Sequence, residues 1–142
     1  MRLWHLKLLD VLPNDILKQL WKDCCEIARQ INVEGITEDI LVNRVLESPP
    51  VEFLKYGVKV WHEMRNRDLD ADIHDFAIWM TPKCLNIGKE DTAEYPDLFP
   101  RWHTNRYMWQ CYVALEELYD CKAISNEDWE KIDKRMRSTW HV

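Results

Sequence analysis

The sequence predicts a single all-α domain, and three observations lead to this prediction. Apolar residues recur at helical spacing along most of the 142 residues, and no stretch alternates convincingly between apolar and polar residues, as a half-buried strand would. The chain has only three glycines, which argues against the glycine-dependent turns of a β-sandwich, a P-loop or a dinucleotide-binding fold. Its length suits one ordinary domain, so residues 1–142 are expected to form one.

A long first helix is predicted to begin at Pro13-Asn14-Asp15, after a short apolar and basic segment at the start of the chain. Proline in a first turn, with Asn or Asp beside it, suits the unpaired amides at that end of a helix. Gly35 is expected to end the unit. The cleanest apolar stripe of the sequence follows the predicted start and consists of Ile16, Leu17, Leu20, Trp21, Cys24, Ile27, Ala28 and Ile31.

Two further helices are predicted, one on each side of Pro49-Pro50, because proline disfavours helical backbone at the residue before it. The earlier one is expected to be capped by Thr37. Its inward-facing residues are expected to be Ile40, Leu41 and Val45. The later one is expected to end near residues 65–68, and its apolar face consists of Phe53, Leu54, Val58, Trp61 and Met64.

The second half of the chain is predicted to hold a short helix at residues 70–80, a long loop and two more helices. The loop is expected to run from Thr81 to Arg101, and irregular segments of such length in small domains are often functional. The last helix is expected to open with a capping-box-like pair, Ser125 and Asp128. The helix before it is indicated by Tyr107, Met108, Cys111, Tyr112, Leu115, Leu118 and Tyr119.

Charge and hydropathy exclude several classes of protein. Nineteen Lys and Arg against 25 Asp and Glu give a formal net charge of −6, which lowers the expectation of non-specific binding to nucleic acid. No apolar stretch approaches the roughly 20 residues that cross a bilayer, and no signal-peptide pattern follows the first residues. A cytoplasmic protein without a membrane partner is therefore expected.

The five cysteines and five histidines lack the spacing of a metal centre. The sequence contains no C-x-x-C, H-x-x-x-H or H-E-x-x-H pattern. Intracellular cysteines are generally reduced and often fill the core, and this is the interpretation favoured for these thiols. Neither a metal nor a cofactor is expected.

Eight tryptophans are unusually many for this length. Those that lie on or beside apolar stripes are predicted to belong to the core; they are Trp21, Trp61, Trp109 and Trp129. Two interpretations remain for the others, which either cover the edges of the core or stack on nucleobases as exposed aromatic residues can. These are Trp4, Trp79, Trp102 and Trp140.

The border of the first helical stripe holds a pattern with catalytic potential. Asp23 lies at the edge of the stripe, and a carboxylate at the border of a buried face can acquire the shifted pKa that acid/base catalysis requires. Lys18, Lys22 and Arg29 form a basic line further round the helix. Ordinary solvated side chains explain the same pattern, so these residues do not by themselves declare a function.

Two motifs, one at each end of the chain, form a specific pair. The first is Met1-Arg2-Leu3-Trp4-His5, followed by Leu12-Pro13 and Trp21-Lys22-Asp23-Cys24. The second is Asn105-Arg106-Tyr107, followed by Gln110-Cys111-Tyr112. Together they resemble a bacterial branch of the pyrimidine dimer DNA glycosylase family, which is related to endonuclease V of phage.

The resemblance implies a compact helical DNA-repair enzyme that acts on damaged or abasic double-stranded DNA without a metal or cofactor. In this family the N-terminal α-amino group attacks the sugar C1′, forms an imine and cleaves the strand by β-elimination. Carried over to this chain, the nucleophile is the amine of Met1, and Asp23 stands in the place of the catalytic carboxylate. A nearby carboxylate stabilises an oxocarbenium-like sugar and moves protons.

The resemblance also implies residues that bind DNA. Arg2 matches the basic residue beside the nucleophile, and Lys22 stands where the family has an arginine, so both are expected to contact phosphates. His5 and Arg106 are expected to help line the site.

Two other functions stay open beside this one. Glu26 stands where the phage branch has an arginine, and no Lys or Arg occurs from Tyr107 to Cys121. These departures suit a non-catalytic binding module on the same scaffold, which takes a protein partner or binds DNA weakly. The third hypothesis is the same imine chemistry on a different nucleotide or base.

Overall fold

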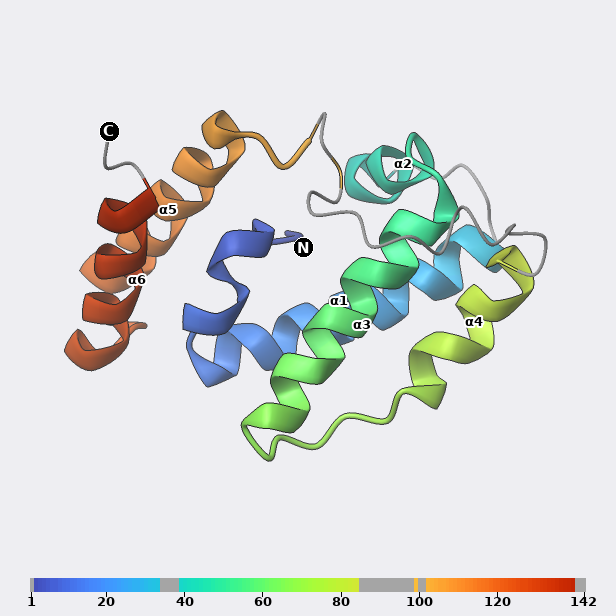
Figure 1. The fold of residues 1–142 in the computed structure, drawn as a ribbon, viewed down its shortest axis with the longest axis horizontal. Helices are drawn as coiled ribbons and strands as arrows, with labels where there is room; N and C mark the ends of the chain where they lie inside the picture. The colour runs from blue at the N-terminus through green and yellow to red at the C-terminus, as the bar shows by residue number, and fades with distance from the viewer. Residues whose placement is uncertain (1, 34–38, 85–98, 100–101, 140–142) are drawn as a thin grey trace.

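The structure, a computed structural model, is all-α, which confirms the predicted fold class (Figure 1). It describes residues 2–33, 39–84, 99 and 102–139, and these ranges contain no strand. The helices in chain order are the 3-10 helix η1 (Leu6–Val11), α1 (Asn14–Val33), α2 (Ile40–Leu46), α3 (Pro50–Asn66), α4 (His74–Cys84), α5 (Asn105–Asp120) and α6 (Asn126–Thr139).

The helices enclose the first residues of the chain (Figure 1). On one side α1, α3 and α4 pack against one another, and α2 packs on α1 and α3. On the other side α5 and α6 lie next to each other as a pair. The segment that leads into η1 passes between these two groups, because η1 contacts both α3 and α6.

The apolar stripe of α1 lies at the centre of the core, as predicted. Leu17, Cys24 and Ile27 are fully buried, and Trp21 packs against the ring of Phe76 from α4 with 5.8 Å between ring centroids. Full burial of one such apolar side chain stabilises the fold by about 1.5–3 kcal/mol. Helical periodicity alone was therefore enough to identify this face.

Helix α3 brings its backbone close to α4 at a glycine. A Cβ atom added to Gly57 would lie 2.2 Å from Cζ of Phe76, so the Phe76 ring occupies the space of the missing side chain. The Phe76 ring also packs edge to face against the Phe53 ring, with 5.4 Å between ring centroids. The buried face of α3 includes Tyr56 and Val60, which the predicted face omitted, whereas the predicted Leu54, Val58 and Trp61 are half-buried.

Two arginines fasten η1 to the rest of the molecule. Arg67, at the end of α3, donates hydrogen bonds to the carbonyl oxygens of Leu9 and Leu12. Arg135 of α6 donates to the Lys7 carbonyl at 2.7 Å and forms an ion pair with Asp10. These bonds fix the end of the N-terminal segment from two sides.

The orientation of α2 differs from the prediction. Ile40, expected to face inward, is 86% exposed, and Val42 is fully buried in its place. The cap is Asp39, whose carboxylate accepts hydrogen bonds from the Leu41 and Val42 amides, whereas the predicted cap Thr37 lies outside the described residues. Because α2 has only seven residues, its few apolar positions did not define a unique buried face.

The predicted loop from Thr81 to Arg101 begins too early, because α4 continues to Cys84. Within the rest of this range the structure describes only Phe99, which is buried. The last two helices begin close to the predicted positions. Thr104 caps α5 by accepting a hydrogen bond from the Tyr107 amide, and Ser125 accepts one from the Asp128 amide as the capping pattern predicted.

Three of the four tryptophans predicted for the core lie in it or pack against it, and Trp109 does not. Trp21 is buried, and Trp61 and Trp129 are half-buried, but Trp109 is 51% exposed and does not belong to the core. Trp4, for which an exposed role was considered, is buried. Trp79 and Trp102 are half-buried, and Trp140 lies outside the described residues.

Of the four cysteines whose side chains the structure describes, two are buried in the core and two are not. Cys24 and Cys111 are buried, Cys25 is half-buried and Cys121 is exposed, and all four are free thiols. Burial raises the pKa of the Cys24 thiol well above its usual value, which makes it a poor nucleophile. Among the helices that the structure describes, none is long and apolar enough to span a membrane.

Candidate active site

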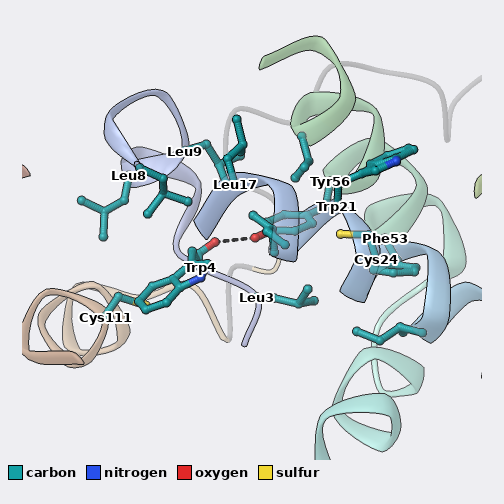
Figure 2. Close-up of a cluster of buried hydrophobic side chains, with 14 of the residues drawn as sticks. Leu3, Trp4, Leu8, Leu9, Leu17, Trp21, Cys24, Phe53, Tyr56 and Cys111 are labelled. Carbon is teal, nitrogen blue, oxygen red and sulfur yellow. Dashed lines mark hydrogen bonds between the residues drawn. The ribbon is translucent and has the colours of Figure 1, made fainter. Parts of the chain in front are cut away.

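The chain enters the interior of the molecule almost at its start. Leu3, Trp4 and His5 are all buried, although the first residues of most domains are poorly ordered. The hydroxyl of Tyr107 donates a hydrogen bond of 2.6 Å to the Leu3 carbonyl. The hydroxyl of Tyr56 donates one of 2.6 Å to the Trp4 carbonyl, drawn as a dashed line in Figure 2. Two tyrosines from separate helices thus hold consecutive peptide groups.

A pair of histidines holds the next two residues. His5 Nδ1 accepts a hydrogen bond from the Lys7 amide, and its Nε2 donates one of 2.9 Å to the His103 carbonyl. His103 Nδ1 accepts from the Leu6 amide at 3.3 Å, and the two rings stack with 5.2 Å between centroids. These partners assign the Nε2–H tautomer to both rings. Each Nδ1 is therefore an acceptor, and protonation there would break a bond to the N-terminal segment.

The environment of His103 keeps its ring neutral. Burial, and secondarily the neighbouring His5, lowers the pKa of His103 from 6.5 to about 3. Its Nε2 atom is buried and has no hydrogen-bond partner among the described residues. Aromatic rings surround His103 instead, at centroid distances between 4.9 and 5.6 Å; they belong to Tyr56, Phe99, Trp102 and Tyr107.

This aromatic cluster forms one wall beside the start of the chain. Tyr107 comes from the first turn of α5, and Trp102 comes from the segment before it. Burial raises the pKa of the Tyr107 phenol above its usual value, so its hydroxyl stays protonated as a donor to Leu3. Cys111, one turn further along α5, also has a raised pKa through burial, and the His5 amide and Arg2 lower it in part. The sequence pointed to these side chains only indirectly, because Tyr107 and Cys111 belong to the second motif and Trp102 was among the tryptophans considered for base stacking.

An open hollow of about 560 Å³ adjoins this wall at Arg2. The guanidinium of Arg2 lies over the Trp4 ring at 5.4 Å, and that of Arg44 lies over the Trp102 ring at 5.8 Å. Asp39 brings a carboxylate to the hollow, and Ile40 and Leu41 bring apolar side chains. The arginines and the apolar side chains together suit a nucleotide, because its base is apolar on its faces and its phosphate is anionic.

Three of the predicted site residues lie at or near this start. Arg2 lines the hollow, and His5 lies behind it, buried between the N-terminal segment and His103. Arg106 is exposed and directly precedes Tyr107 on α5. Met1, the predicted nucleophile, lies outside the described residues.

Asp23, the predicted carboxylate, is 8% exposed on α1, even though aspartate is rarely buried without partners. Its Oδ1 accepts a hydrogen bond of 3.0 Å from the Gln19 amide nitrogen. No hydrogen bond or ion pair of the described residues joins Asp23 to Arg2 or Arg106.

Lys22 lies in a different hollow, between α1 and α4. It is exposed there beside Asp70, Asp72 and Asp75, whose negative charges repel phosphate. Burial, and secondarily Asp75, raises the pKa of the nearby Cys25 thiol to about 12. The structure therefore does not bring Lys22 together with Arg2 at one hollow.

Glu26, one turn beyond Lys22, is a firmly ionised carboxylate. Hydrogen bonds from Arg29, and secondarily from Gln30, lower the pKa of Glu26 to about 2. The ion pair with Arg29 has a distance of 2.6 Å, and both side chains are substantially exposed. Arg29 is thus engaged by a carboxylate on its own helix. In the described ranges, no three His, Cys, Asp or Glu side chains gather in a way that could hold a metal ion.

Comparison with known proteins identifies a family. The family model described as pyrimidine dimer DNA glycosylase matches residues 1–76, which is more than half of the chain. The match covers the N-terminal segment and the helices α1, α2 and α3 that pack beside it. Comparison with curated proteins and with solved structures gives no match.

Proposed function

Because this chain belongs to the pyrimidine dimer DNA glycosylase family, we propose that it is a DNA glycosylase and abasic-site lyase whose nucleophile is the α-amino group of Met1. The observation that carries this proposal is the set of side-chain hydrogen bonds that hold the backbone at the start of the chain. Tyr107, Tyr56 and the His5–His103 pair fix the backbone from Leu3 onward. Such support suits a terminus that must present its amine at one position.

An α-amine is a suitable nucleophile at physiological pH. Its reference pKa of about 7.7–8.0 leaves a useful neutral fraction, without the desolvation that a lysine needs. The amine nitrogen bonds to the sugar C1′, and the glycosidic bond breaks with its electron pair leaving on the base, which takes up a proton. Opening of the sugar ring then gives an imine between the amine and C1′.

The imine makes strand cleavage possible. Removal of a proton from C2′ breaks the bond between C3′ and its phosphate oxygen, and water later hydrolyses the imine to restore the amine. We assign the proton transfers and the stabilisation of the cationic sugar to Asp23, on the strength of the family position and of its low exposure. Gln19 holds one oxygen of this carboxylate and so restricts its orientation.

The proposed DNA contacts divide into two groups. Arg2 lines the same hollow as Tyr107, and Arg106 directly precedes Tyr107 in the sequence. These two arginines are the proposed phosphate contacts near the amine. Lys22 is a weaker candidate, because three aspartates share its hollow. His5 is assigned a positioning role instead of a DNA contact, because it is buried and both ring nitrogens bond within the protein.

The second candidate function is a non-catalytic module that binds a protein partner. The acidic hollow around Lys22 and the net charge of −6 favour it. Affinity for abasic duplex DNA measured across salt concentrations separates the two. Phosphate contacts predict a steep loss of affinity with salt, whereas the absence of binding at low salt supports the protein-partner function.

The deciding experiment is borohydride trapping of the imine on an oligonucleotide with one abasic site. Protein with a free N-terminus is compared with protein acetylated selectively at the α-amine, which is feasible at mildly acidic pH because lysine amines stay protonated. The proposal predicts a covalent adduct with the free protein alone. An equal adduct with the blocked protein would identify a lysine as the nucleophile, and no adduct with either would refute lyase activity.

A further inference from the structure

The most exposed large apolar side chain of the described residues is Ile40, which is 86% exposed. Single exposed apolar residues are common on protein surfaces and need a second observation before they carry meaning. For Ile40 that observation is its location, because it lines the hollow that also contains Arg2 and Trp102. The side chain therefore stands at the edge of the hollow next to the start of the chain.

Helix α2 holds Ile40 firmly in this place. Val42 and Val45 anchor the helix in the core, with exposures of 0% and 3%. Asp39 caps its first turn through hydrogen bonds to the Leu41 and Val42 amides. Ile40 is thus the first residue of a helix fixed at both its cap and its buried face.

Positive charge accompanies this apolar tip. Arg44, one helical turn after Ile40, is on the same side of α2 and lines the same hollow, where Arg2 also lies. The carboxylate of Asp39 in the hollow is engaged by the amides of α2. Arg44 also forms an ion pair with Glu47 at 2.5 Å. An apolar side chain that shares a hollow with two arginines complements a nucleic-acid duplex, which offers both stacked bases and anionic backbones.

We propose that Ile40 is a wedge that enters the base stack of duplex DNA beside the nucleotide on which the enzyme acts. This inference rests on the proposed function, and it adds a specificity-determining residue for double-stranded substrate. Apolar side chains such as isoleucine unstack a base step and kink the duplex where they insert. Ile40 would fill the space that opens at this base step when the duplex is kinked and unstacked, which exposes C1′ to the amine.

The test compares Ile40→Ala with Ile78→Ala in the full-length protein. Ile78 is a matched control, because it is a 65% exposed isoleucine on α4 that is not part of the hollow. Borohydride trapping rates are measured on one abasic-site oligonucleotide, both single-stranded and in a duplex. A single strand requires no unstacking from a partner strand, so the ratio of duplex to single-strand rates isolates the wedge.

The proposal predicts that Ile40→Ala lowers the duplex rate about tenfold, as a loss of roughly 1.4 kcal/mol of unstacking energy does, and leaves the single-strand rate within about twofold of wild type. Ile78→Ala is expected to match wild type on both. As a second readout, 2-aminopurine is placed next to the abasic site in the duplex, where its fluorescence increases when the base is unstacked. Binding of wild type is expected to increase this fluorescence, and binding of Ile40→Ala is expected to increase it less.

Three outcomes would overturn the wedge. The two variants could behave alike on duplex DNA, or Ile40→Ala could slow both substrates equally, which indicates an effect on chemistry or folding. The remaining outcome is brightening of 2-aminopurine that is unchanged by Ile40→Ala. Absence of any adduct with wild type on both the duplex and the single strand instead refutes the proposed function, and the wedge with it.

Discussion

Replacement of Tyr107 by phenylalanine removes one hydroxyl group and leaves the ring in place. That hydroxyl donates a 2.6 Å hydrogen bond to the carbonyl of Leu3, whose side chain and backbone are fully buried. The net contribution of such a bond is about 0.5–1.5 kcal/mol, but a buried acceptor left without a partner costs about 1–3 kcal/mol. We therefore expect Tyr107→Phe to lower the free energy of unfolding by about 1–3 kcal/mol.

Tyr119→Phe is the matched control on the same helix. The Tyr119 hydroxyl donates to Asn126 at an exposed position, so water replaces the lost partner. We expect its effect to stay within about 0.5 kcal/mol. Urea denaturation of both variants, followed by tryptophan fluorescence, gives the two free energies. The rate of imine trapping on the abasic oligonucleotide gives the functional consequence for Tyr107→Phe.

The two measurements distinguish a structural role from a positioning role. If Tyr107 positions the start of the chain, Tyr107→Phe slows adduct formation under conditions where the protein is fully folded, whereas Tyr119→Phe does not. Equal losses of stability in the two variants would refute the reasoning about the buried Leu3 carbonyl. An unchanged trapping rate in folded Tyr107→Phe would refute the positioning role.

Three further predictions follow from other parts of the structure. The pKa of His103 falls from 6.5 to about 3 on folding, so the unfolded chain binds more protons than the folded chain between these pH values. The free energy of unfolding is therefore expected to decrease as pH falls below 6.5, by about 1.4 kcal/mol per pH unit. Urea denaturation at pH 7 and pH 5 measures this pH dependence, which His103→Asn should reduce. Gly57→Ala is expected to destabilise the fold by about 1–3 kcal/mol, because its Cβ overlaps the Phe76 ring, and a melting temperature equal to wild type would contradict this. Asp23→Asn is expected to abolish most lyase activity while Asp23→Glu retains it, and strand cleavage by Asp23→Asn at the wild-type rate would exclude the proposed carboxylate role.

Much of the helical architecture could be predicted because its causes are local. The stripe of α1 repeats over many turns, so its buried face is defined by the sequence whatever packs against it. The capping residue Ser125 acts on an amide three positions away, and its role was likewise visible in the sequence. Ile40 and Trp109 were assigned wrongly to the interior, because periodicity identifies an apolar side chain but does not tell whether a neighbouring element covers it.

The same distinction between local and long-range causes applies to the candidate site. The sequence by itself determined the helical class and, through its terminal motifs, the family and the residues to consider, including Arg2 and Asp23. Only the tertiary structure decided that Tyr107 reaches Leu3, a contact between residues 104 positions apart, and that Lys22 lies in a separate acidic hollow. The physical reason is that helix propensity and capping act within a few residues, whereas burial, hydrogen-bond partners and local charge depend on segments that folding brings together.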